Sequence, residues 1–198
     1  QLKGGVGTQE GANAGQHVFG FDGFNRVGIP AQLEVDTPDI VRLAVQQNRL
    51  IGMEGRIKPE PALGRERRGH VWLIGLDRVA KRNAFDIELL NALSLAYGEF
   101  EADSEARVAV VFAHGDHFTA GLDLASASAS LAQGWQVPAG GCDPWGVFAG
   151  PRVSKPVIVA AQGYCLTIGI ELMLAADINL CASNTRFAQL DVQRGMLP

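Results

Sequence analysis

Two apolar segments, each of which runs through a small-residue turn into a helix, constrain this chain most. The first is VAVVFA at 108–113, followed by the turn HFTAGLDL at 117–124. The second is KPVIVAAQGYCLTIGIELMLAADI at 155–178, which reads as a buried strand, a glycine-containing turn and an apolar helix. Strands that alternate with helices are typical of α/β proteins. We therefore expect an α/β fold whose functional groups lie at these two turns.

The same two turns predict a site that stabilises a developing negative charge. Ala120 and Gly121 leave the backbone N–H groups of the first turn uncovered, and fixed N–H donors from two such turns can hold an oxyanion. Glu171 stands among apolar residues near the start of the second helix. A carboxylate in such surroundings is unfavourable unless it has a partner or a function, so Glu171 is a candidate catalytic residue.

Length, charge and cysteine content limit the kinds of protein that this chain can be. A chain of 198 residues favours one domain. A net charge of −4 and a pI near 5.5 do not support binding to nucleic acid or to an anionic membrane. The 14 uncharged residues between Pro156 and Glu171 fall short of the roughly 20 that a membrane span needs. Three cysteines without C-x-x-C spacing argue against a disulfide framework or a zinc site and fit a cytoplasmic protein.

The chain divides into two regions of different composition. Residues 1–64 hold 11 of the 24 glycines and read as a poorly ordered extension, with one helix that Thr37 can cap. Residues 65–198 read as an ordered core. Within it we expect strands at 70–76, 108–113, 156–161 and 177–181, helices at 86–100, from 123 and at about 168–176, and a long loop at 132–154.

Four motifs of the core resemble the crotonase family, also called the enoyl-CoA hydratase/isomerase family. FTAGLDL at 118–124 is similar to the family's F-S-A-G-x-D-L, and 155–177 is similar to its K-P-x-I-A-x-x-x-G-x-x-x-G-x-G-x-E-L-x-x-x-x-D. RNAF at 82–85 resembles R-N-A-L, and FAQLDVQRGMLP at 187–198 resembles F-G-x-P-E-x-x-x-G-x-x-P. The resemblance implies a spiral of ββα units. Because the chain starts at Gln1 and stops within a motif, we expect it to be a fragment that lacks the family's C-terminal helical part.

The resemblance also implies a role for individual residues. It assigns the oxyanion-hole donors to the backbones of Ala120 and Ile168 and the catalytic carboxylates to Glu171 and Asp191. The expected CoA-binding residues are Arg82, Asn83, Ala84, Asp123, Leu124 and Gly169. Three positions depart from the family pattern: Ile168 replaces a glycine, Leu190 replaces a proline, and Asp191 replaces a glutamate of hydratases. Aspartate is one methylene shorter, and a misplacement of about 1 Å can cost roughly 100-fold in rate.

Three functions follow from these residues. The first is an enoyl-CoA hydratase of fatty acid metabolism and β-oxidation, in which Glu171 and Asp191 manage a water molecule and the α-proton. The second is a double-bond isomerase of the same family, and the third is a non-catalytic acyl-CoA-binding protein. In each case the CoA thioester is the ligand and no separate cofactor is expected. His114 and His117 flank the first turn without further ligands nearby, so no metal is expected. The resemblance implies a homo-oligomer, a trimer or hexamer, for the full-length protein.

Overall fold

The computed structural model describes residues 62–194, apart from the side chains of residues 128–131, 192 and 194. The helix expected after Thr37 lies outside the described residues, as does the end of the last motif. All structural statements below concern the described part of the chain.

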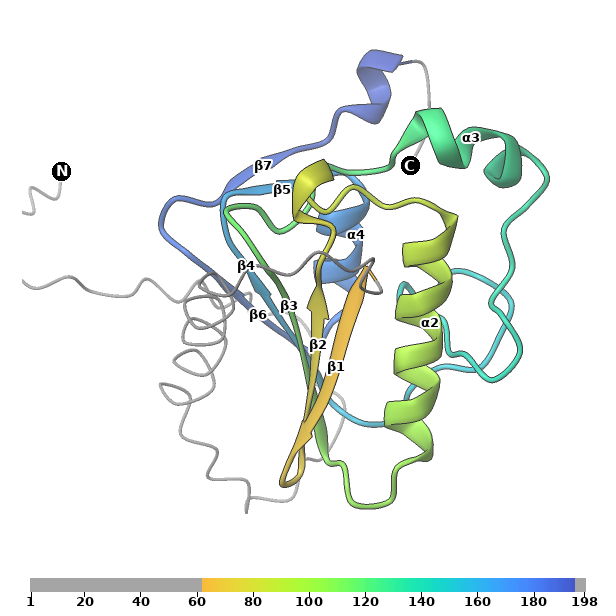
Figure 1. The fold of residues 1–198 in the computed structure, drawn as a ribbon, viewed down its shortest axis with the longest axis vertical. Helices are drawn as coiled ribbons and strands as arrows, with labels where there is room; N and C mark the ends of the chain where they lie inside the picture. Colours follow the sequence, from red (N-terminus) through yellow and green to blue (C-terminus); the bar gives the residue numbers. More distant parts are fainter. Residues whose placement is uncertain (1–61, 195–198) are drawn as a thin grey trace, which may run out of the picture.

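A five-stranded sheet forms the centre of the described region (Figure 1). Its strand order is β1-β2-β3-β4-β6, with β1 antiparallel to β2 and the other neighbours parallel. The strands are β1 (Leu63–Arg68), β2 (Val71–Leu76), β3 (Val108–Ala113), β4 (Val157–Ala161) and β6 (Ile178–Cys181). A second, parallel sheet consists of β5 (Tyr164–Leu166) and β7 (Arg186–Ala188). The helices are η2 (Val79–Lys81), α2 (Ile87–Ala102), α3 (Leu124–Ala132), α4 (Ile168–Ala175) and η3 (Asp191–Arg194).

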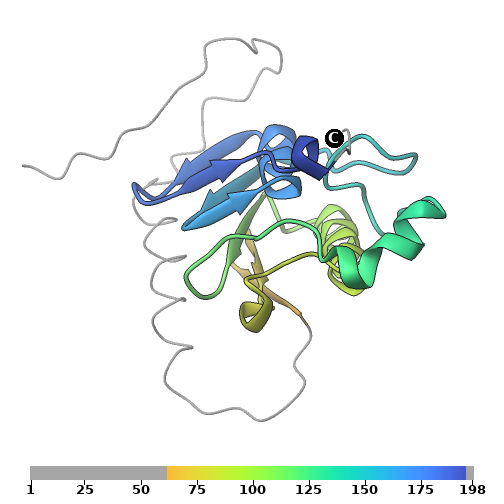
Figure 2. The ribbon, with the colours of Figure 1, turned by 90° about the horizontal axis from the view of Figure 1, so that it is seen from above.

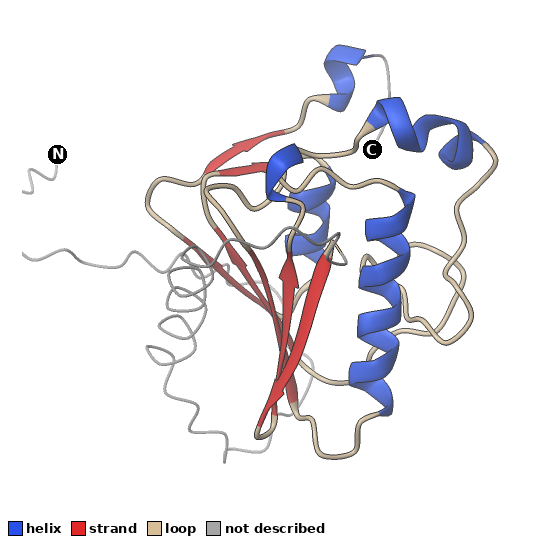
Figure 3. Ribbon diagram, viewed as in Figure 1, coloured by secondary structure: helices blue, strands red, loops and turns tan. Residues whose placement is uncertain are grey.

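Helix α2 covers one face of the large sheet (Figure 3). It begins where the Asp86 carboxylate accepts a hydrogen bond from the Leu89 N–H at 2.9 Å, which is an N-cap contact. The apolar side chains predicted to share one face of this helix are all buried: Leu89, Leu93, Ala96, Tyr97 and Phe100. They pack into one core with Leu172 of α4, so both helices lie on the same side of the sheet.

The expected mixed α/β fold is confirmed, and the predicted strands and helices of the core match the observed ones to within a few residues. Three strands were missed. β5 and β7 have only three residues each. β1 has the sequence LGRERR, whose exposed charged residues give no apolar pattern because the strand lies at the edge of the sheet. The predicted boundary between residues 64 and 65 therefore cuts β1, and buried Leu63 belongs to the core.

The connections at one end of the sheet carry the motifs. Strands β2, β3 and β4 are parallel, so their carboxyl ends lie at the same edge. Figures 1 and 2 show η2, α3 and η3 gathered there, beside the small sheet. This placement brings together turns that are far apart in the sequence, as expected for functional loops of an α/β protein.

Candidate active site

The turn at 118–123 is held between two other segments by backbone hydrogen bonds. On one side, the Phe85 N–H donates to the Gly121 carbonyl and the Asp123 N–H donates to the Phe85 carbonyl, both at 2.8 Å. On the other side, the Thr119 N–H donates to the Tyr164 carbonyl at 2.9 Å, so the turn extends the small sheet. Backbone contacts on both sides fix the direction in which the remaining N–H groups of this turn point.

These contacts correct one predicted oxyanion donor. The Ala120 N–H donates to the Arg82 carbonyl at 2.9 Å, so it is already used within the fold. The Leu122 N–H has no acceptor among the described residues, and neither has the N–H of Ile168, the first residue of α4. The first N–H groups of a helix are ordinarily open to an outside acceptor. The structure thus favours Leu122 over Ala120 as a candidate donor, and the role of Ile168 stays a prediction.

The two turns that carry these donors touch each other. Gly121 has φ of +96°, and a Cβ at this position would lie 2.6 Å from the Thr167 Oγ1. Thr167 itself has φ of 46° and ψ of −110°, a conformation that is unfavourable for a residue other than glycine. It is held there because its N–H donates to the Ala188 carbonyl at 3.1 Å and its carbonyl accepts the N–H groups of Ile170 and Glu171. This strained residue sets the position of the N–H that follows it.

Both predicted catalytic carboxylates lie next to these turns. Glu171 is in the first turn of α4 and Asp191 begins η3, and both are half-buried. The side-chain amide of Gln189 joins them: its Nε2 donates to the Glu171 Oε1 at 3.2 Å and to the Asp191 Oδ2 at 2.8 Å. A cavity of about 20 Å³, which is enough for one water molecule, lies beside Asp191. Its lining residues are Ala120, Leu122, Leu124, Thr167, Leu190 and Asp191.

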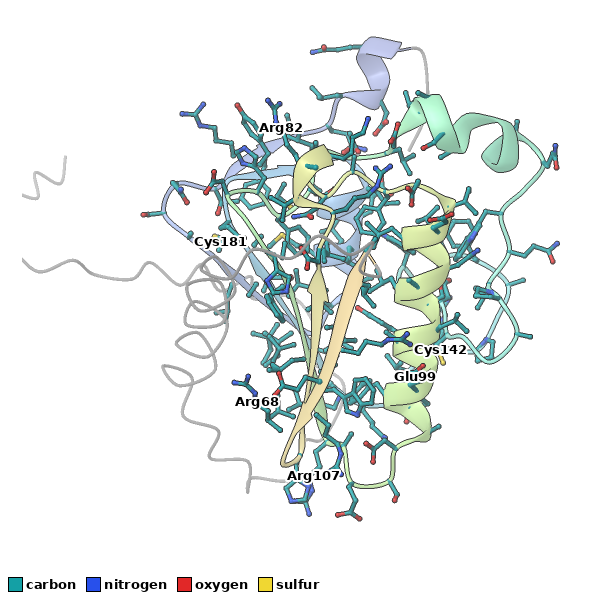
Figure 4. The ribbon with its side chains drawn as sticks, viewed as in Figure 1. Arg68, Arg82, Glu99, Arg107, Cys142 and Cys181 are labelled. Carbon is teal, nitrogen blue, oxygen red and sulfur yellow. The ribbon has the colours of Figure 1, made fainter. Side chains whose placement is uncertain are left out.

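The predicted CoA-facing turn has a left-handed backbone at two positions. Arg82 and Asn83 have φ of 51° and 53°. The Asn83 side chain is buried and donates to the carbonyls of His114 and His117 at 2.9 and 2.8 Å. The carbonyls of Arg82, Asn83 and Ala84 each accept one hydrogen bond from within the chain. Since a carbonyl has two lone pairs, contacts between these carbonyls and CoA stay a prediction. The Arg82 side chain is exposed beside η2 at the same end of the molecule (Figure 4).

Arg78 is a positioning residue that the sequence did not reveal. Its guanidinium forms ion pairs with Asp86 at 2.8 Å and Asp123 at 3.0 Å, and it donates to the Ala84 carbonyl at 2.9 Å. The hydrogen bond from Arg78 lowers the pKa of the Asp123 carboxyl. Asp123, expected to bind CoA, therefore has a structural partner, and its carbonyl accepts the Ala127 N–H of α3. Nothing in the sequence around Arg78 distinguishes it from a solvated surface arginine.

Gly169, the three cysteines and His117 are the other residues that the sequence singled out. Gly169 is buried, and a Cβ there would lie 3.2 Å from the Cys165 Sγ. Cys142 and Cys165 are buried and Cys181 is exposed; burial raises the pKa of the Cys165 thiol. Figure 4 shows Cys142 beside α2 and Cys181 on the other side of the sheet. The His117 Nδ1 accepts the Tyr164 N–H at 3.2 Å. Residues 62–194 hold no group of three potential metal ligands and no helix that is both long and apolar enough to span a membrane.

Comparison with known proteins identifies the family. The family model for enoyl-CoA hydratase/isomerase matches residues 66–198. The chain belongs to the enoyl-CoA hydratase/isomerase family. A carnitinyl-CoA dehydratase from Salmonella enteritidis is 38% identical over 137 residues, which are 67% of this chain and 50% of that protein. The crotonase resemblance seen in the sequence is thereby confirmed.

Solved structures agree with this assignment. The crystal structure of a probable enoyl-CoA hydratase/isomerase from Mycobacterium abscessus shares 51% identity, with a TM-score of 0.66 over 69% of this chain and 53% of that one. An enoyl-CoA hydratase from Mycobacterium tuberculosis H37Rv shares 30% identity, with a TM-score of 0.57 over 70% of this chain and 52% of that one. The chain thus spans about half of the length of each of these relatives.

Proposed function

We propose that the full-length protein is an enoyl-CoA hydratase that adds water to a 2-enoyl-CoA thioester. One observation carries the proposal: Glu171 and Asp191 share the amide of Gln189, and Asp191 lines a cavity of the size of one water molecule. Two carboxylates around one water are what hydration requires, because the water must lose a proton while the substrate gains one.

In the proposed reaction the substrate carbonyl oxygen accepts hydrogen bonds from the Leu122 and Ile168 N–H groups. These donors stabilise the charge that develops on that oxygen when the oxygen of water bonds to C3 of the substrate. One carboxylate takes the proton that the water loses, and the carboxylate pair returns a proton to C2. The net change is the addition of one water across the C2–C3 double bond, with both carboxylates restored.

The name of a similar protein supports this choice. A dehydratase removes water from a hydroxyacyl thioester, which is the reverse of hydration, and the relative from Salmonella enteritidis carries that name.

The residues that would hold CoA belong to the same proposal. The carbonyls of Arg82, Asn83 and Ala84 would accept from the adenine, and the exposed Arg82 guanidinium would pair with a phosphate. Leu124 and Gly169 would contact the rest of the substrate. Assembly as a homo-oligomer and a cytoplasmic location are proposed with it.

Isomerisation of a 3-enoyl-CoA is the second candidate, and the shorter carboxylate of Asp191 favours it. An isomerase needs only to move a proton between two carbons of the substrate, so it does not need a second carboxylate to grip water.

Product analysis with both substrates distinguishes these reactions. If hydration is the native reaction, Asp191→Glu retains or raises the hydration rate of 2-enoyl-CoA and Asp191→Asn lowers it. If isomerisation is native, Asp191→Glu lowers the conversion of 3-enoyl-CoA. Unchanged rates in both variants would exclude Asp191 from the reaction. Binding of an acyl-CoA without turnover of either substrate by the full-length wild type would contradict both candidates and leave an acyl-CoA-binding protein.

A further inference from the structure

The contacts of Gln189 lie at the centre of the candidate site, at a position that the family motif leaves open. Gln189 stands between β7 and η3, two residues before Asp191. A primary amide nitrogen carries two hydrogens, and Nε2 has two carboxylate acceptors here, Glu171 and Asp191. The donor capacity of this side chain is therefore used entirely on the two carboxylates.

The other end of the same amide has no partner in the described part of the chain. The Gln189 Oε1 is buried and has no hydrogen-bond partner within residues 62–194. A buried carbonyl without a donor is unfavourable. Rotation of the amide by half a turn would not relieve this, because the oxygen would then face two carboxylate oxygens. The carboxylates thus fix the orientation of the amide, although this orientation leaves the oxygen without a partner among the described residues.

The Gln189 amide thus makes two hydrogen bonds to the carboxylates and leaves its own oxygen unpaired within the described residues. This arrangement indicates a role in the candidate site more than in the stability of the fold. Two carboxylates close enough to share one nitrogen repel each other. An amide with two N–H donors holds them together without adding a positive charge, whereas a lysine or arginine would form an ion pair and hold them in the ionised form more strongly. The amide therefore keeps the two carboxylates close together.

We propose that Gln189 is a positioning residue that sets the spacing of Glu171 and Asp191 around the reacting water. The inference rests on the proposed hydration. It does not require Gln189 to touch the substrate. It predicts that removal of the amide separates the two carboxylates and slows the chemical step while substrate binding and folding persist.

The kinetic test compares Gln189→Met with wild type in the full-length protein. Methionine is unbranched and of similar length but donates no hydrogen bond. We expect the kcat for hydration of 2-enoyl-CoA to fall about 100-fold, as for a misplacement of roughly 1 Å, with KM changed by less than about threefold. The melting temperature should change little, because the substitution removes the unsatisfied oxygen together with two hydrogen bonds to half-buried carboxylates. The matched control is Gln193→Met on the exposed side of η3, which should retain wild-type kinetics.

An unchanged kcat in Gln189→Met would overturn the inference, and so would a loss of kcat that is matched by a lower melting temperature.

A second measurement, by NMR, does not depend on turnover. The side-chain amide protons of Gln189, assigned by their absence from the NMR spectrum of Gln189→Met, should both shift when the carboxylates are changed, one in Glu171→Gln and the other in Asp191→Asn. If neither shifts, Gln189 does not bridge the carboxylates. If both shift but the wild type does not hydrate 2-enoyl-CoA, the positioning stands and the proposed function fails.

Discussion

Gly169→Ala sets helix propensity against packing at the junction of the two candidate donor turns. Gly169 is the second residue of α4, and alanine in place of glycine stabilises a helix by about 1 kcal/mol. A Cβ at this position, however, would lie less than 3.0 Å from the Thr119 Cγ2, whereas an ordinary contact begins at 3.4 Å. The two turns would therefore have to move apart by more than half an ångström.

Thr119 cannot rotate its methyl group away. Its Oγ1 donates to the Asn83 carbonyl at 2.7 Å and accepts the Gly121 N–H at 3.1 Å, so another rotamer would break both bonds in a buried place. Overpacking costs about 1–3 kcal/mol, and a pinned neighbour places this site at the upper end. With helix propensity offsetting about 1 kcal/mol, we expect a net loss of about 2 kcal/mol in the free energy of unfolding.

A double-mutant cycle isolates the clash. Thr119→Ser keeps the hydroxyl and removes the methyl, at a cost of about 1 kcal/mol for one buried carbon. In the Thr119→Ser background the clash is absent, so Gly169→Ala should stabilise the protein by about 1 kcal/mol through helix propensity, and the coupling energy is about 3 kcal/mol. Urea unfolding of the four proteins measures these values. Stabilisation of the wild-type background by Gly169→Ala, or additive costs in the double variant, would refute the packing argument.

Three further predictions concern stability around the site. Arg78→Met should lower the melting temperature more than Arg65→Met. Arg78 joins two carboxylates and a carbonyl in a partly buried position, whereas within residues 62–194 Arg65 pairs only with the exposed Glu99. Equal losses would contradict the positioning role of Arg78. Burial lowers the pKa of His114, so on acidification the unfolded chain takes up the proton before the folded protein does. The free energy of unfolding should therefore fall as the pH drops below about 6.5. A urea-unfolding series from pH 7.5 to 5.5 should show this dependence in wild type and a weaker one in His114→Gln. Thr167→Gly should raise the free energy of unfolding by about 1 kcal/mol through relief of its positive φ, and a loss of stability would show that the threonine side chain contributes more than the strain removes.

The parts of the fold that the sequence predicted are those with a strong apolar pattern. Val108–Ala113 is apolar at every position and buried throughout, and the helical spacing of Leu89, Leu93 and Ala96 shows which face of α2 packs on the sheet. β1 escaped prediction because an edge strand buries little, and its four arginine and glutamate residues hide the alternation.

The site shows a similar limit. The sequence located the turn around Ala120, but which N–H of that turn is free depends on the Arg82 carbonyl, which comes from a distant segment. Likewise, Gln189 donates to Glu171, which lies 18 residues earlier in the chain. No periodicity or spacing encodes such contacts, because they arise only when separate connections meet at one end of the sheet.

If the protein is a hydratase, Glu171 and Asp191 together add water to an enoyl thioester. The most direct measurement incubates the full-length protein with 2-enoyl-CoA in ¹⁸O-labelled water and determines the mass of the product. We predict a 3-hydroxyacyl-CoA that carries one ¹⁸O atom from the wild type, formed about 100-fold or more slowly by Glu171→Gln with acyl-CoA binding retained. A wild-type product without the label, or an unchanged rate of label incorporation in Glu171→Gln, would exclude hydration by these two carboxylates.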